Sequence, residues 1–318
     1  CLTRVVSIVA LALVLSDVRP LHAQQATHGA TPRYALAEQS LDGPDATGVT
    51  DAPEASHQAK QHRGKLTLYV DNDTGGMNLV DDSDRWYSNG AALGYTHQPG
   101  WASRLADWLP FQNELGQAKD RAGAGYIVGQ LIFTPEDITV RGPQPNDRPF
   151  VGYNFFGAYW QRANDHTLEG IQVDLGFVGN STQADSIQEL IHDGFGGDEP
   201  SGWPNQVEDE PTGQVFLRKK WKWRAWSDDD STLAMEVLPY GTLALGSVNR
   251  SLELGGDLRL GWHLPEDFGP GRLLDPLDAV TGPPDGKWHA YGFLGGGVRF
   301  VEHNLFIEGS EFQSGPGV

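Results

Sequence analysis

The chain has 318 residues, of which 39 % are hydrophobic and 10 % aromatic, and its formal net charge is −19 at pH 7. This negative charge argues against nucleic-acid binding, because no surplus of cations is available to neutralise phosphates. The only cysteine is Cys1, which excludes a disulfide framework and a thiolate metal cluster. Ten Trp and nine Tyr residues are typical of the aromatic girdles of membrane barrels.

The first 63 residues are predicted to lie outside the folded domain. Residues 1–23 resemble a removed export signal, because Arg4 precedes the apolar run 5–15 and Ala23 offers a small residue for cleavage. The apolar run is too short to span a bilayer as a helix. Residues 24–63 have almost no large apolar side chains, so we expect a disordered tail and a folded domain over 64–318.

Residues 251–264 show the clearest pattern in the chain. Most even positions hold Leu or Trp, whereas the odd positions include Glu253, Asp257, Arg259 and His263. Side chains alternate between the two faces of a strand, so one face is apolar and the other is charged. The segment is also long enough to cross a bilayer at a tilt. It predicts an antiparallel transmembrane β-barrel with a polar interior.

Segments of this kind recur along the chain, separated by turn residues. About ten strands are predicted, at residues 65–73, 84–97, 123–133, 150–162, 167–180, 213–226, 231–245, 251–264, 288–301 and 304–308. Residues 313–318 instead form a turn-like end. Because an open sheet edge inside lipid leaves backbone groups unpaired, we expect that C-terminal strands are missing.

Residues 185–193 interrupt the β pattern. Ile187, Leu190 and Ile191 have helical spacing, Asp185 and Gln188 form a pair like a capping box, and Gly194 stands where a helix would stop. The sequence therefore predicts one short helix inside a long loop.

Polar residues that could support chemistry gather at the predicted strand ends, at 71–73, 84–90, 130–135 and 147–150, and at 188–192 on the helix. Each has an ordinary structural explanation. Residues 71–73 suit a turn, Ser88 suits a small polar lining position, and an isolated His192 is usually a polar or packed residue. Residues 148–149 suit a strand entry.

Several motifs together resemble the outer-membrane lipid A 3'-O-deacylase family over about residues 64–309. They are VDND (70–73), DRWYSNGAALGYTH (84–97), GQLIFTPEDI (129–138), NDRPF (146–150), the helix with Gln188 and His192, and GWPNQVEDEP (202–211). The resemblance implies a twelve-stranded outer-membrane barrel, of which about ten strands are present here. It also implies removal of the 3'-acyloxyacyl group of lipid A, with calcium required.

The resemblance assigns roles to individual residues. Asn72 and Asp73 match the Asn-Asp pair of the family, and Ser88 stands where the family has Thr. His192 matches the helix histidine proposed as the base, which would activate water near neutral pH. Oxygens of Asp73, Asn72 and Ser88 would bind calcium and stabilise the oxyanion. Arg141 lies where the family has a basic pair, and it would contact the substrate.

Residues 215–226 alternate cations with apolar side chains. Arg218, Lys220, Lys222, Arg224 and Trp226 share one face, which we expect to be inside the barrel. Buried cations are costly unless carboxylates pair with them, and the carboxylates at positions 253 and 257 are candidates. The alternative is attraction of lipid A phosphates. The lysine at position 219 falls on the outward face, where it would reach toward the membrane interface.

The sequence therefore predicts a calcium-dependent ester hydrolase of the bacterial outer membrane. Its partners would be lipid A, or lipopolysaccharide, and the surrounding membrane lipid, without nucleic acid or a protein partner. Two alternatives remain open. One is a non-enzymatic pore or structural barrel, because polar-lined barrels commonly conduct solutes. The other is a different outer-membrane acyl hydrolase, such as a phospholipase.

Overall fold

The structure is a computed structural model that describes residues 3–16, 37–40, 64–72, 89–106, 121–195, 198–228, 230, 232–269 and 288–312. Its strands are β1 Thr3–Ser16, β2 Ala37–Ser40, β3 Gly64–Asn72, β4 Asn89–His97, β5 Arg121–Phe133, β6 Val151–Ala163, β7 Thr167–Val178, β8 Glu210–Trp221, β9 Trp223–Ser227, β10 Leu233–Gly246, β11 Asn249–Trp262 and β12 His289–Asn304. Its helices are α1 Gly100–Ala106, α2 Ala184–Phe195 and α3 Leu305–Glu308, with the 3₁₀ turns η2 Asn180–Thr182 and η3 Trp203–Asn205.

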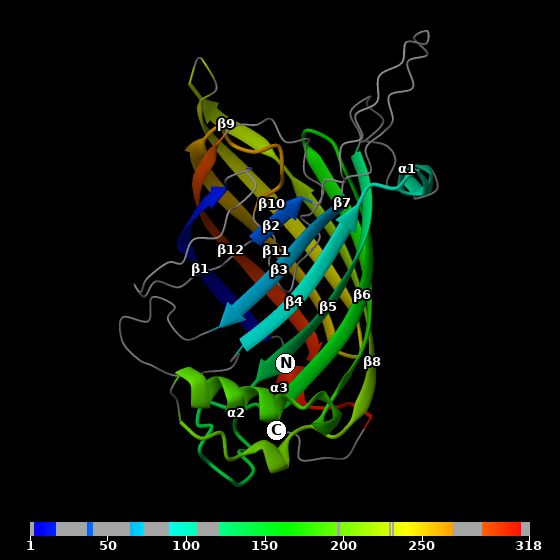
Figure 1. The fold of residues 1–318 in the computed structure, drawn as a ribbon, viewed down its shortest axis with the longest axis vertical. Coiled ribbons are helices and arrows are strands. Elements are labelled where there is room, and N and C mark those ends of the chain that lie inside the picture. The colour runs from blue at the N-terminus through cyan, green and yellow to red at the C-terminus, as the bar shows by residue number, and fades with distance from the viewer. Residues whose placement is uncertain are drawn as a thin grey trace, which may run out of the picture.

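These strands form one antiparallel sheet. Within the described residues it has twelve strands, in the order β1-β12-β11-β10-β8-β7-β6-β5-β4-β3-β2, with β9 beside β10. Figure 1 shows the sheet curled into an open barrel, with α1 and β9 near one end and α2 and α3 at the other. The predicted antiparallel all-β architecture is confirmed. No helix in the described part of the chain is long and apolar enough to cross a membrane.

The two-residue alternation is also confirmed. On β7 the odd positions face outward, where Leu175 is 66 % exposed, and Gln172 and Asp174 are buried inside. On β11 Leu254 and Leu260 are exposed, and Arg259 is fully buried. The apolar face of the sheet is thus its outer face, as expected for a barrel surrounded by lipid.

The structure corrects the last predicted strand and the number of helices. Residues 304–308 do not form a strand, because Asn304 caps a short helix, and its Oδ1 accepts a hydrogen bond from the backbone N of Phe306 at 3.0 Å. Leu305 and Phe306 turn into the barrel, where both are buried. Helix α2 confirms the predicted helix, but the expectation of one helix is wrong, since α1 and α3 are also present.

Strands β1 and β2 lie in the ranges for which the sequence predicts an export signal and a disordered tail. The predicted domain boundaries at 23, 24 and 63 stay predictions. The segment predicted at 213–226 divides into β8 and β9. A register shift between Met235 and Glu236 places Trp226 opposite Met235, on the outer face, so its predicted place beside Arg224 is wrong.

Paired charges occupy the barrel interior at the end near β9. Arg259 donates from Nε and Nη2 to Glu236, at 2.8 and 2.6 Å, and also pairs with Asp267. Lys220 lies 4.0 Å from Asp257, and its Nζ donates to the backbone O of Phe268 at 3.0 Å. Of the cations predicted to face inward, Lys220 and Arg224 thus form ion pairs, with Asp257 and Glu236, which supports the structural explanation for them over phosphate attraction.

The structure also places Glu253, the other predicted partner, and the outward Lys219. Glu253 pairs with Arg299, whose Nε donates to it at 2.7 Å, and it also interacts electrostatically with Arg218 of β8. Lys219 lies on the outer face as predicted, where its Nζ is 3.1 Å from Glu169, which also pairs with Arg162. A neighbouring carboxylate thus compensates this outward charge.

Side-chain clusters cross the interior at both ends. At the end near α3, the ring of Phe306 stacks on Phe133 with centroids 4.0 Å apart and contacts Tyr153. At the other end, Phe268 folds into the barrel after β11 and packs on Leu168, fully buried. The α3 segment and the residues directly after β11 therefore both contribute side chains to the barrel interior.

We expect Glu236→Gln to destabilise the barrel by about 3–5 kcal/mol, because it removes one of the two carboxylates that pair with the buried guanidinium of Arg259. Glu311→Gln is the matched control, since Glu311 pairs with Arg250 at the surface and its loss should change stability little. Urea unfolding in detergent micelles, followed by Trp fluorescence, measures the difference. Equal shifts of both unfolding midpoints would contradict a structural role for the interior pair.

Candidate functional site

Helix α2 packs on the outer wall of the barrel, where β5 ends and β6 begins. Gly152 of β6 shares its face with Phe156, which is 52 % exposed on the outside. A Cβ at Gly152 would clash with Oγ1 of Thr182 and lie 2.5 Å from Cβ of Ala184, the first residue of α2. The absence of a side chain at position 152 is what allows the helix to approach the wall this closely.

A small apolar cluster holds the helix in place. It contains Ile132, Ile138, Phe150, Ala184 and Trp203. The rings of Phe150 and Trp203 lie 5.0 Å apart. The indole N–H of Trp203 donates to Oε1 of the fully buried Gln188 at 2.9 Å, which fixes the face that α2 turns toward the wall.

Polar groups line the contact between wall and helix. Nε2 of Gln130 and Nδ2 of Asn154 both donate to the backbone O of Thr182, at 2.9 and 3.4 Å. Oδ1 of Asn154 and Nε2 of Gln188 are buried without a hydrogen-bond partner among the described residues. Buried polar atoms normally find partners, so this contact has capacity to bind a polar group.

Asn72, the predicted site residue at the end of β3, lies beside the part of the wall that supports α2. Asn72 is the register partner of Asn89, and Asn89 is the partner of Ile132, which belongs to the cluster under α2. The ends of β3 and β4 therefore lie beside the strands that support the helix. Asp73 and Ser88 lie outside the described residues, and their positions stay predictions.

His192 is on α2, one helical turn after Gln188. Its Nδ1 lies 2.7 Å from the backbone O of Asp198. A carbonyl oxygen can only accept, so Nδ1 must donate, and the neutral ring then has its basic lone pair on Nε2. The hydrogen bond thus fixes the tautomer that a general base needs.

A cleft of about 890 Å³ separates α2 from the segment 199–209. Arg141 is the only cation among its lining residues, and five carboxylates share the lining: Asp185, Glu189, Glu199, Glu208 and Asp209. Nδ2 of Asn205 donates to the backbone O of Arg141 at 2.6 Å, which holds this part of the loop. Arg141 and His192 are thus placed near the same helix, although His192 does not line the cleft.

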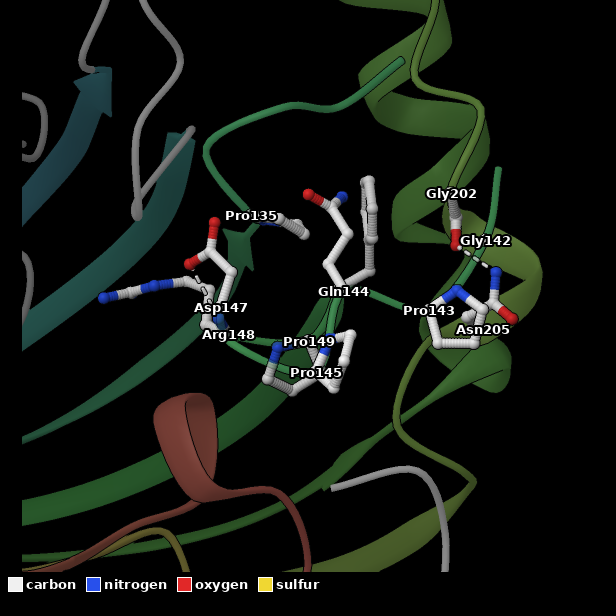
Figure 2. Close-up of a pocket in the computed structure, with 11 residues that line it drawn as sticks. Pro135, Gly142, Pro143, Gln144, Pro145, Asp147, Arg148, Pro149, Gly202 and Asn205 are labelled. Atoms are coloured by element: carbon white, nitrogen blue, oxygen red, sulfur yellow. Dashed lines mark hydrogen bonds between the residues drawn. The ribbon is translucent and has the colours of Figure 1, made fainter. Parts of the chain in front are cut away.

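The NDRPF motif shapes the loop between β5 and β6. Asp147 accepts hydrogen bonds from the backbone N of Glu136 and of Arg148, both at 2.7 Å. Asp147 and Arg148 line a cavity of about 50 Å³. Figure 2 shows them with Pro143 and Pro145, which belong to the same lining. This volume is too small for an acyl chain, so the motif serves to support the wall before β6.

Gln130 lies in the group 130–135 that the sequence marked as a candidate, whereas Gly152, Asn154 and Trp203 were not predicted to belong to the site. Gln130, Gln188 and Trp203 lie inside motifs that resemble the family, which was the available signal. Gly152 and Asn154 gave no such signal, because their importance depends on how α2 lies against the wall.

Comparisons with known proteins agree with this fold. A family model described as "Outer membrane protein LpxR" matches residues 24–318. Among solved structures, LpxR from Salmonella typhimurium matches with a TM-score of 0.60 and 19 % sequence identity, over 77 % of this chain and 79 % of that chain. No curated protein matches the chain. The structural match confirms the barrel fold.

We expect Gly152→Ala to displace α2 from the wall, because the added methyl group would overlap Thr182 and Ala184. Gly213→Ala is the matched control, since a Cβ there meets no atom within 4 Å. Limited proteolysis of the folded protein should cut the segment 179–209 faster in the first variant only. Unchanged cleavage of the Gly152 variant would show that α2 does not depend on this contact.

Proposed function

The chain belongs to the LpxR family of outer membrane proteins, and on this premise we propose that it is a lipid A 3'-O-deacylase. The enzyme would hydrolyse the ester that links the 3'-acyloxyacyl group to the sugar, releasing a carboxylic acid and a 3'-hydroxyl group. The observation that supports this most directly is His192, held in one tautomer on a helix that lies against the outer wall. Lipid A in the membrane could reach such a position sideways.

In the proposed reaction, Nε2 of His192 accepts a proton from water as the water oxygen attacks the ester carbonyl carbon. The ester C–O bond to the sugar then breaks, and the proton passes from His192 to the leaving sugar oxygen. Gln188 and Trp203 position α2, and therefore the imidazole, through their buried hydrogen bond. No serine nucleophile is needed.

Calcium is part of the proposal. Asn72, Asp73 and Ser88 offer amide, carboxylate and hydroxyl oxygens, which are the hard ligands that calcium prefers. Bound there, calcium would supply positive charge opposite the developing oxyanion. No cluster of three His, Cys, Asp or Glu side chains suited to a metal occurs within the described ranges. The proposed ligand set therefore depends on Asp73 and Ser88.

The described interior side chains favour an enzyme over an open pore. Phe306 stacks on Phe133 inside one end of the barrel, and Phe268 packs on Leu168 inside the other. The ion pair of Arg259 and Glu236 lies near Phe268. These side chains narrow the interior, whereas a conducting channel needs a continuous aqueous path.

We expect His192→Ala to lower lipid A deacylation by about 10²–10⁴-fold, the range that a general base contributes. His166→Ala is the control, because His166 is exposed in the turn between β6 and β7, far from α2. Membranes with either variant are incubated with lipid A and calcium, and acylation is measured by mass spectrometry. Equal activity of both variants excludes His192 as the base, and phospholipid cleavage without lipid A cleavage identifies another acyl hydrolase.

Arg141 is proposed to contact a phosphate of lipid A, as the only cation in a cleft otherwise lined by carboxylates. Because it is exposed, we expect Arg141→Gln to raise KM about threefold while kcat stays the same. Arg104→Gln, on α1 at the opposite end, is the control. A fall in kcat with unchanged KM would contradict a role limited to binding.

A further inference from the structure

Helix α2 has two different flanks. Its inner face holds the buried residues Ala184 and Gln188. Asp185 and Glu189 follow on one flank, where they line the cleft. Ile187 and Leu190 lie on the other flank, at a spacing of three residues, and they are 38 % and 72 % exposed. The helix is therefore amphipathic, with an apolar flank that the described residues leave uncovered.

This apolar flank is continuous with the lipid-facing surface of the barrel. Gly152, under the start of α2, is on the same outer face as Asn154 and Phe156. The register partner of Asn154 on β7 is Phe177, which is itself exposed on the outside. Gly152 is two residues from Asn154, the partner of Phe177, so the start of the helix lies beside the exposed apolar wall. Figure 1 shows α2 at this end of the barrel.

Exposed Trp side chains are distributed unequally between the two edges of this surface. The exposed Trp side chains of the described residues all lie at the end opposite α2: Trp101, Trp223, Trp226, Trp262 and Trp288. A membrane barrel usually has an aromatic girdle at both interfaces. In the described part of the chain, the edge near α2 has no exposed Trp, and its exposed apolar side chains include Phe177, Phe312, Ile187 and Leu190.

We propose that α2 is an interfacial membrane helix, with Ile187 and Leu190 inserted among the acyl chains of the outer leaflet. A helix with a charged flank and an apolar flank lies in the plane of the interface, with the apolar flank several Å below the headgroups. The partner is the hydrocarbon of the membrane in which this outer membrane protein resides. An interfacial position of α2 would determine the depth of His192 in the membrane. It can be tested without measuring ester hydrolysis.

Spin labelling of the full chain tests the proposal. Cys1 is the only cysteine, so single nitroxide labels can be placed in a Cys1→Ser background. Leu190→Cys and Ile187→Cys probe the apolar flank. Glu189→Cys, on the opposite flank of the same helix, is the aqueous reference, and Leu175→Cys on β7 is the lipid reference. The labelled proteins are reconstituted in vesicles of phospholipid and lipopolysaccharide.

Collision with oxygen, which concentrates in lipid, is compared with collision with a water-soluble nickel chelate. We expect labels at 190 and 187 to match the lipid reference, with oxygen accessibility several-fold above nickel accessibility, and the label at 189 to show the reverse. Nickel accessibility at 190 equal to that at 189 would place the flank in water. Low accessibility to both reagents would mean that protein covers it. Either result overturns the proposal, whatever the deacylase assay gives.

Discussion

The architecture depends on one constraint, which is that side chains alternate across the sheet while the apolar face must meet lipid. Most strands that satisfy this constraint send their charged residues inward, where an unpaired charge is costly, and the outward Lys219 is paired with Glu169. The interior pairs Arg259–Glu236 and Arg299–Glu253 follow from it. The same constraint makes polar residues on the outer face expensive, so Gln130 and Asn154 are tolerated only because α2 covers them.

Much of the fold could be predicted from the sequence, because period-two alternation is a local property. β7 and β11 were predicted within two residues of their observed ends, and α2 was predicted from helical spacing. The prediction of a strand over residues 304–308 was wrong, because the conformation of this segment depends on the burial of Phe306 against Phe133. These two residues are far apart in sequence. The division of β8 from β9 depends on a register shift against β10, which no local pattern shows.

The candidate site was predicted in part, through the resemblance to a family and not through a local pattern of residues. Residue chemistry alone gave ordinary explanations for His192 and for Asn72, and the resemblance to a family gave them roles. The structure adds how α2 is held, through Gly152, Trp203 and the buried Gln188. These contacts join residues about 15 to 30 positions apart, so they depend on the approach of a helix to a wall and not on any motif.

The place of the candidate site outside the barrel has a consequence for how a substrate arrives. Phe306 of α3 packs inside the barrel, and Phe268 packs inside it near β9. The contacts that hold α2 lie instead on the outer face of the wall, at Gly152 and in the cluster with Trp203. A lipid substrate would therefore diffuse to this site within the plane of the membrane and would not need to enter the bore.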